Sequence, residues 1–126
     1  MIALSDHSYL TPEEYLAFEA ASDIRHEYVD GEVYAMAGTS KNHNLISGNL
    51  YILLRRHLQN SSCTTFMADI KVKLQTGRRF FYPDLVVTCD PEDGTSELFV
   101  EKPKLIIEVL SPSTKNFDQT AKFLYY

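Results

Sequence analysis

The sequence has no tryptophan and only two cysteines, Cys63 and Cys89, in 126 residues. The cysteines stand apart without a Cys-x-x-Cys spacing, so we expect reduced thiols and neither a disulfide framework nor a zinc site. No apolar run approaches the length of a membrane span, and residues 1–7 lack the basic and then apolar layout of a signal peptide. These absences favour a cytoplasmic protein that does not bind membranes.

The composition is otherwise that of an ordinary globular protein. Hydrophobic residues make up 44% of the chain and charged residues 23%, without a low-complexity tract, which argues against a disordered protein. A chain of this length can build one core, so a single domain over residues 1–126 is predicted, with residues 1–8 as a flexible N-terminus. The net charge of −5 argues against broad electrostatic binding to nucleic acid but leaves a local basic face open.

Local signals predict two helices and a hairpin in the first half of the chain. Residues Thr11-Pro12-Glu13-Glu14 form a capping box with proline at the first helical position, so a helix is expected from Pro12 to about Ala21. The Asp30-Gly31 pair predicts a tight hairpin over Tyr28 to Met36, because both turn positions favour positive φ. Aliphatic residues at spacings of three and four predict an amphipathic second helix after the polar loop Gly38 to His43.

Some charged residues of this first half have an ordinary explanation. Glu13, Glu14 and Glu19 are most simply solvent groups on the first helix. Glu27 lies at the mouth of the hairpin, where the local sequence favours a solvated strand end. His43 at the entrance of the second helix can contact a ligand, although a lone histidine near a helix start is more often a surface or cap residue.

The middle of the chain predicts further strands. Residues Ala68 to Gln75 alternate between apolar and polar side chains, which indicates a half-exposed strand. A turn follows into Phe80-Phe81-Tyr82, so this strand is expected to pair with the strand of Asp84 as a hairpin. The exposed basic residues of this region form either a phosphate-facing patch or a merely solvated edge, and the sequence favours neither. They are Lys71, Lys73, Arg78 and Arg79.

Two short apolar, β-branched runs each carry one acid: Asp84 in YPDLVV and Glu108 in LIIEVLSP. Both runs are typical of strands near the middle of a sheet, where an ionised carboxylate costs several kcal/mol unless a cation or strong donors compensate it. If the strands are adjacent, the two acids can converge, and hard oxygen ligands with water or phosphate match Mg²⁺. Taken singly, each acid has a simpler explanation, a turn residue for Asp84 and a lysine-paired strand residue for Glu108. A two-carboxylate glycosidase is a weaker alternative, because nothing suggests a sugar platform.

At these residues the sequence resembles a known family. The stretches YPDLVV, LIIEVLSPST and DQTAK, with HEYVDGEVY and HNLISGNLYILL upstream, are similar to the Uma family of bacterial restriction-endonuclease-like proteins, a branch of the PD-(D/E)XK nuclease superfamily. The resemblance covers the chain from about Tyr9 onward. It implies an α/β restriction-endonuclease-like core, in which helices flank a mixed β-sheet. It also implies cleavage of DNA phosphodiester bonds that depends on Mg²⁺ or Mn²⁺.

The resemblance assigns expected roles to individual residues. Asp84 corresponds to the motif aspartate and Glu108 to the motif glutamate, and both are implied metal ligands. The carbonyl of Val109 is an implied third ligand, and Glu27 an implied further acid beside the metal. These assignments make DNA the expected partner.

Two departures from the family pattern qualify these expectations. The superfamily expects a lysine at the place of Leu110, and a resembling arrangement moves it to the following helix, where Lys122 is the candidate. Without the resemblance, Lys122 is a surface lysine paired with Asp118 one turn earlier. Members of the family also continue into further strands, so a C-terminally truncated form, or one completed by a partner such as a second copy, is expected. The alternative function is a catalytically inactive nuclease-fold interaction module.

Overall fold

The structure, a computed structural model, describes residues 2–3, 9–36 and 38–110. In that part of the chain the helices are α1 (Pro12–Ala20) and α2 (Lys41–His57), with the short 3-10 helices η1 (Gln75–Gly77) and η2 (Pro91–Gly94). The strands are β1 (Ile2–Ala3), β2 (His26–Val29), β3 (Glu32–Ala35), β4 (Thr64–Met67), β5 (Lys71–Leu74), β6 (Arg79–Phe81), β7 (Leu85–Thr88), β8 (Phe99–Val100) and β9 (Pro103–Ile107). The helix expected from about Thr114, which contains Lys122, lies outside the described residues.

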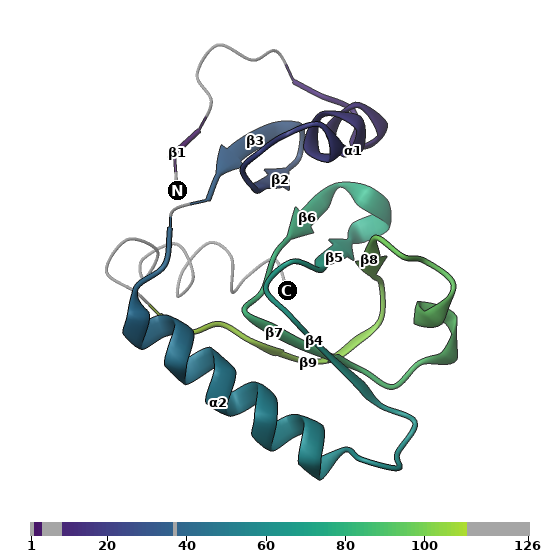
Figure 1. Ribbon diagram of the computed structural model, residues 1–126. Helices are drawn as coiled ribbons and strands as arrows, with labels where there is room; N and C mark the ends of the chain where they lie inside the picture. Colours follow the sequence, from purple (N-terminus) through teal and green to yellow (C-terminus); the bar gives the residue numbers. More distant parts are fainter. Residues whose placement is uncertain (1, 4–8, 37, 111–126) are drawn as a thin grey trace.

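The described strands form two sheets. The larger sheet has the order β1-β3-β2-β6-β5-β8, and the smaller one has the order β4-β7-β9. β5 and β8 are parallel, and the other described pairs are antiparallel. Helix α1 lies beside the larger sheet, and α2 runs along the smaller one (Figure 1). The predicted α/β class, with a mixed sheet flanked by helices, is confirmed: the larger sheet is mixed, and a second, antiparallel sheet lies beside it.

Helix α1 begins as its sequence predicts. Thr11 caps the helix by accepting a hydrogen bond from the Glu14 amide at 3.1 Å, and the Glu14 carboxylate accepts one from the Thr11 amide at 2.8 Å. One turn further, Tyr15 is fully buried and stacks on Tyr28 of β2, with 4.8 Å between ring centroids. Phe80 of β6 completes this aromatic core. The capping box thus sets where α1 starts, and Tyr15 attaches it to the sheet.

The β2–β3 hairpin also follows its sequence signal. Asp30 has a φ of 46° and Gly31 a φ of 99°, so both turn residues are in the left-handed region. The register pairs Val29 with Glu32 across this two-residue turn. At Gly31 an added Cβ would lie 2.6 Å from the ring of Tyr9, so the close approach also requires glycine.

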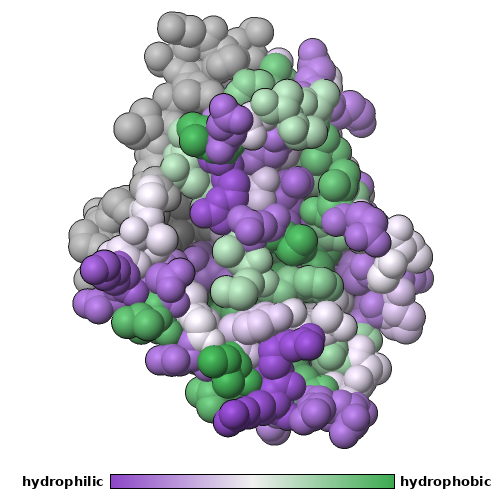
Figure 2. Space-filling model, in the orientation of Figure 1, coloured by the Kyte–Doolittle hydropathy of each residue, from purple (hydrophilic) through white to green (hydrophobic). Residues whose placement is uncertain are grey.

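Helix α2 has apolar residues on two sides. Leu50 and Leu54 are partly buried, and the helix contacts β4. A second set of aliphatic side chains is about half exposed or more: Leu45, Ile46, Ile52 and Leu53. Apolar residues come to the surface along the lower left of the molecule, where α2 lies (Figure 2). The expected amphipathic helix is present, but only part of its apolar surface packs on the described residues.

The pairing predicted for the middle of the chain is partly wrong. β5 does pair with β6, but the Asp84 strand β7 pairs with β4 and β9. The chain leaves the larger sheet at Tyr82-Pro83, where proline has no amide for the ladder. Strand β4, which the sequence analysis did not identify, ends at a turn in which Ala68 has a φ of 45°. The observed strand, β5, is therefore shorter than the predicted strand from Ala68 to Gln75.

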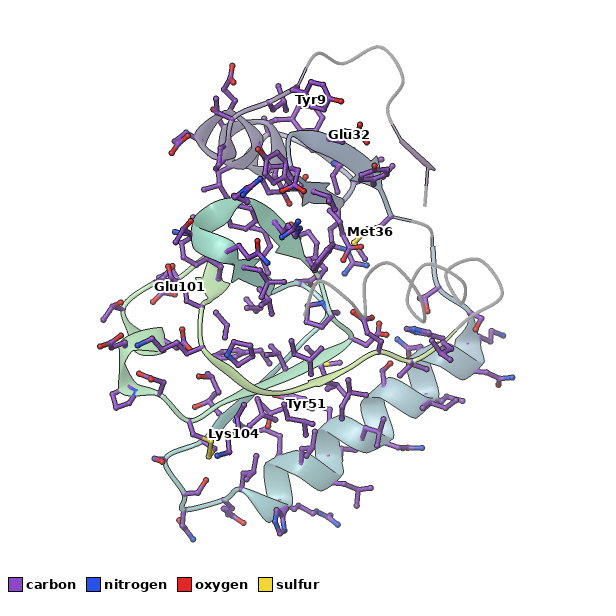
Figure 3. All side chains as sticks on the ribbon, turned by 180° about the vertical axis from the view of Figure 1, so that it is seen from behind. Tyr9, Glu32, Met36, Tyr51, Glu101 and Lys104 are labelled. Carbon is purple, nitrogen blue, oxygen red and sulfur yellow. A yellow bond between two sulfur atoms is a disulfide. The ribbon has the colours of Figure 1, made fainter. Side chains whose placement is uncertain are left out.

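The two cysteines form a disulfide, so the expectation of reduced thiols is wrong. The Cα atoms of Cys63 and Cys89 lie 4.0 Å apart. The β4–β7 register pairs Thr64 with Thr88, which places the two cysteines opposite each other one residue further along. Figure 3 shows this bond in yellow near Lys104. Their separation of 26 residues gave no hint of contact because only strand pairing brings them together.

Candidate active site

Asp84 lies at the point where the chain passes from one sheet to the other. It follows the buried Pro83 and directly precedes β7. Its backbone carbonyl accepts a hydrogen bond from the Ala68 amide at 3.1 Å, which ties this segment to the end of β4. The Asp84 side chain remains 20% exposed. An acid is therefore held at a strand entry with one side open to solvent.

The register of β7 and β9 relates Asp84 to Glu108. Leu85 pairs with Ile107 and Val86 with Ile106, so continuing the antiparallel register by one residue sets Asp84 opposite Glu108. Directly opposite residues point to the same face of a sheet, with Cβ atoms about 4.5–5.5 Å apart. The expected adjacency of the two acid-bearing strands is confirmed, and Glu108 is partly buried. The shared role of the two acids as metal ligands stays a prediction.

Val109 contributes its backbone to Asp84. The Val109 amide donates a hydrogen bond to Asp84 Oδ2 at 2.6 Å. A charged acceptor makes such a bond short and strong, so it fixes the carboxylate against the end of β9. The contact is made by the Val109 amide, whereas the predicted ligand is its carbonyl, and that carbonyl role also stays a prediction.

His43 is the residue of this site that sequence reasoning undervalued. Its Nε2 lies 3.2 Å from Asp84 Oδ1, and the two side chains are 16% and 20% exposed. The His43 amide donates to the Ser40 hydroxyl at 3.1 Å, so its backbone takes part in capping α2. His43 is thus a first-turn residue whose amide bonds the Ser40 cap and whose imidazole contacts the predicted metal ligand. The signal in the sequence was the polar run before the helix, which did not reveal what the imidazole faces.

Glu27 is buried beside the same segment. It is 3% exposed, and its Oε2 accepts a hydrogen bond from the Tyr82 amide at 2.7 Å. The local interpretation as a solvated strand end is therefore wrong. Its bond ties β2 to the chain two residues before Asp84, and its predicted place beside a metal stays a prediction.

A buried polar cluster supports Tyr82 from the other side. The Tyr82 hydroxyl donates to Glu19 Oε2 at 2.6 Å, and Glu19 Oε1 lies 2.9 Å from His26 Nδ1. Glu19 is only 8% exposed, so its assignment as a solvent group is wrong. Burial raises the pKa of the Tyr82 hydroxyl, which keeps it a neutral donor. The segment that leads to Asp84 is therefore held by Glu27 through its amide and by Glu19 through its side chain.

The expected basic patch is not a uniformly exposed surface. Lys71 is 9% exposed, with Nζ 3.5 Å from the Tyr82 hydroxyl, and burial lowers its pKa. Lys73 lies 3.3 Å from Glu101. Arg79 lies 2.9 Å from Asp30, with Arg78 at 3.5 Å from the same acid. These partners neutralise the region, and Lys71 in particular cannot act as the exposed residue that the alternation predicted.

The donor chemistry of the site fits a hard divalent cation. In the part of the chain that the structure describes, no group of three or more His, Cys, Asp or Glu side chains is arranged to hold a metal ion. Mg²⁺ does not need such a cage, because it commonly binds through one or two carboxylates and keeps several waters. Asp84 directly precedes β7 and Glu108 directly follows β9, so their carboxylates are the candidate ligands for such an ion. Leu110, at the place of the superfamily lysine, is 43% exposed and has no charge to contribute.

The described part of the chain is an α/β fold with mixed strand directions, and comparison with known proteins gives its family. Residues 12–126 match the Uma2 family, described as "Putative restriction endonuclease", and the chain belongs to this family. The resemblance of its motifs to the Uma family is thereby confirmed. In the described part of the chain, neither helix combines the length and apolar character needed to cross a bilayer.

Two similar proteins come from Synechocystis sp. (strain ATCC 27184 / PCC 6803 / Kazusa). The uncharacterized protein slr1290 is 44% identical over 93% of this chain, which spans 62% of the length of that relative. The uncharacterized protein sll1609 is 34% identical over the whole chain, which spans 72% of its length.

A solved structure supports the fold. It is the crystal structure of a "putative nuclease belonging to DUF820" from Anabaena variabilis ATCC 29413, with a TM-score of 0.76 and 19% identity. The similarity covers 91% of this chain and 66% of that one. At this level of identity the likeness confirms the fold alone.

Proposed function

We propose that this protein is a metal-dependent endonuclease that hydrolyses DNA phosphodiester bonds. The observation that carries the proposal is the β7–β9 register, which sets Asp84 opposite Glu108. The Val109 amide holds the Asp84 carboxylate in this position. Membership of the family described as "Putative restriction endonuclease" supports the choice of DNA as substrate.

Each residue has a distinct part in the proposal. Asp84 and Glu108 would hold Mg²⁺ or Mn²⁺, with the Val109 carbonyl as a further oxygen donor and Glu27 as an additional acid behind the site. When bound, the ion supplies a water of lowered pKa and neutralises charge on the phosphate. Lys122 would provide the positive charge that Leu110 cannot provide.

The test compares metal binding and plasmid nicking for the wild type, Asp84→Ala and Glu108→Ala. Each substitution removes a ligand, so nicking with Mg²⁺ should fall on the order of a hundredfold or more, together with metal affinity. Asp69→Ala is the matched control, because the Asp69 side chain is 86% exposed and its ion pair is with Arg25. Equal affinity and equal nicking in all four proteins would contradict the proposal.

The second candidate is a catalytically inactive interaction module with the same fold. Two observations favour it: Leu110 stands in place of a lysine, and α2 exposes Leu45, Ile46, Ile52 and Leu53. Aliphatic surface of this kind is common where proteins associate, including with a second copy. Metal-dependent turnover that disappears in Lys122→Ala would exclude this candidate.

A further inference from the structure

We propose that two copies of this chain pair through the exposed face of helix α2, with the two helices antiparallel and a two-fold axis at Asn49. This face consists of the residues that one side of α2 presents to solvent: Asn42, Leu45, Ile46, Asn49, Ile52, Leu53 and Arg56. The pairing does not depend on the metal site of the proposed function.

The other side of α2 is covered. Ser47 is 7% exposed, and His43, one turn earlier, contacts Asp84. The exposed face lies opposite these residues, and it carries four of the ten large hydrophobic side chains that are exposed in the described part of the chain. Leu45 and Leu53 are 61% and 62% exposed. Aliphatic surface concentrated in this way is typical of a site where proteins associate.

The spacing on the exposed face is the same in both directions from Asn49. Leu45 and Ile46 come four and three residues before it, and Ile52 and Leu53 come three and four residues after it. Residues at these spacings share one face of an α-helix. A two-fold axis through Asn49, perpendicular to the helix, therefore places each aliphatic pair against the opposite pair of a second copy. Such self-complementarity is what a symmetric dimer interface requires, whereas a different partner would not need it.

Asn49 is a polar residue in the middle of this aliphatic face. In paired helices, one asparagine among apolar contact residues fixes the register. Two facing amides can bond each other at the axis, whereas a shifted register leaves both unpaired against hydrocarbon. Asn49 therefore favours one register of two identical helices.

The charges of α2 favour the antiparallel direction. The helix contains no acidic residue, and its last turn carries Arg55, Arg56 and His57. Parallel helices would place Arg56 opposite Arg56 of the second copy. In the antiparallel arrangement Arg56 faces Asn42, whose amide oxygen can accept a hydrogen bond from a guanidinium. The two helix dipoles also oppose each other in this arrangement, which is the favourable direction.

The same charges distinguish a second copy from an acidic partner. Each copy has a net charge of −5 and a basic α2, so two copies repel each other both overall and along the helix. Salt screens this repulsion, so the dimer should become tighter as salt is raised. Binding of nucleic acid or an acidic protein to the basic helix would instead become weaker with salt.

The experiment measures the dissociation constant of the dimer by sedimentation equilibrium on the full 126-residue chain, at low and high salt. The wild type is compared with Leu53→Glu and with Leu98→Glu. Leu98 is 56% exposed and lies outside α2, so its substitution is the matched control. Leu53→Glu should raise the dissociation constant about tenfold or more, because it puts a charge into the apolar contact. Leu98→Glu should dimerise as the wild type does.

A charge exchange at Asn49 tests the position of the axis. In Asn49→Asp and in Asn49→Lys, like charges meet at the axis, so each variant alone should pair about tenfold or more weakly than the wild type. An equimolar mixture should restore a dimer with one copy of each variant, which also shows that both are folded. A mixture that pairs no better than the separate variants would contradict an axis at Asn49.

A double variant tests the direction of the helices. In Asn42→Lys with Arg56→Glu, opposite charges meet between antiparallel copies, whereas like charges meet between parallel copies. A tighter dimer than the wild type supports the antiparallel arrangement, and a weaker one overturns it.

Other results would overturn the proposal as a whole. They are a wild type that is monomeric at every concentration and salt, a complex that dissociates as salt is raised, and equal dissociation constants for Leu53→Glu and Leu98→Glu. Asp84→Ala should dimerise as the wild type does, because Asp84 contacts the covered side of α2 through His43. Failure of the metal site would therefore leave the dimer in place, and loss of the dimer would leave the metal site untested by this measurement but open to its own binding assay.

Discussion

An aspartate lies near each end of strand β7, and the surroundings of the two aspartates differ. Next to Thr88, the last residue of the strand, Asp93 is buried and surrounded by donors that belong to the fold. At the other end, Asp84 immediately precedes Leu85, and the described residues that contact its carboxylate are the Val109 amide and the His43 imidazole. The comparison separates an acid whose bonds complete the fold from the acid that the proposed function assigns to the metal site.

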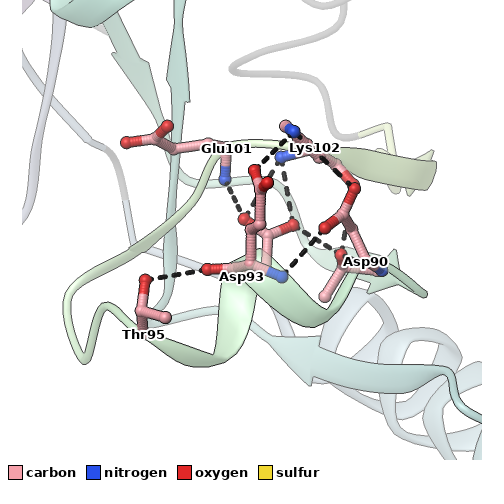
Figure 4. Close-up of polar contacts among 7 residues, drawn as sticks. Asp90, Asp93, Thr95, Glu101 and Lys102 are labelled. Atoms are coloured by element: carbon pink, nitrogen blue, oxygen red, sulfur yellow. Dashed lines mark hydrogen bonds and ion pairs between the residues drawn. The ribbon is translucent and has the colours of Figure 1, made fainter.

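The Thr88 end is closed by several bonds. Asp93 Oδ1 accepts from the Glu101 amide at 2.7 Å, and Asp93 Oδ2 accepts from the Lys102 amide at 3.0 Å and from the Thr88 hydroxyl at 2.5 Å (Figure 4). The disulfide between Cys63 and Cys89 lies beside Thr88 in the same ladder. These bonds compensate the charge of Asp93 from within the chain, so nothing is left for a metal or substrate to supply.

Among the described residues, the Val109 amide and the His43 imidazole contact the Asp84 carboxylate. In the proposed function, Asp84 and Glu108 hold the metal ion at this end. An ionised acid in this position costs free energy that a cation would recover. The Thr88 end of β7 is therefore held by bonds within the fold, whereas the Asp84 end carries the acid of the proposed metal site.

Removal of the disulfide should have the largest effect on stability. In Cys63→Ser with Cys89→Ser, the lost cross-link across a 26-residue separation should cost about 3.5 kcal/mol of unfolding free energy. Denaturant unfolding of the double variant and of the oxidised wild type measures this difference. Divalent-metal affinity at the Asp84 end should stay within about twofold where the folded state is populated. A double variant as stable as the wild type would show that the disulfide does not stabilise the Thr88 end of β7.

Asp93→Asn should have the next largest effect. Asparagine keeps one acceptor oxygen and turns an amide group toward backbone donors, so the free energy of unfolding should fall by about 2–4 kcal/mol. The matched change, Asp84→Asn, should alter stability by less than about 1 kcal/mol while it weakens metal binding. Denaturant unfolding with metal titration checks both. If Asp84→Asn proved the more destabilising of the two, the distinction between the ends would fail.

Glu14→Gln should have the smallest effect on stability. It lies in α1, away from β7, so it serves as a reference for the two larger effects. The hydrogen bond from the Thr11 amide lowers the pKa of Glu14, so the folded state favours its ionised form. The stability from this preference is present above the ordinary glutamate pKa and is lost as the pH falls through the lowered pKa. Glutamine keeps the capping bond but does not titrate. The melting temperature of the wild type should therefore be higher than that of the variant at neutral pH, and the two should be equal in acid. Melting temperatures across this pH range measure the effect, and a pH-independent difference would contradict it.

Local sequence was sufficient wherever neighbouring residues decide the structure. The Thr11–Glu14 capping box and the Asp30-Gly31 turn were predicted correctly because their hydrogen bonds and dihedrals involve residues only a few positions apart. The two acid-bearing strands were also identified, and the family resemblance that they carry is confirmed. Polarity alone misjudged Glu19 and Lys71, because each is buried against Tyr82, which is distant in sequence.

The sequence by itself determined the α/β class, the Asp30-Gly31 turn, the helix starts and the two acids beside strands β7 and β9. Only the tertiary structure decided which of these meet. Strand pairing joined Cys63 to Cys89 and set Asp84 opposite Glu108, and the packing of α2 brought His43 to Asp84. The physical reason is that these contacts span 24 residues or more and depend on register and helix placement, which no local pattern encodes.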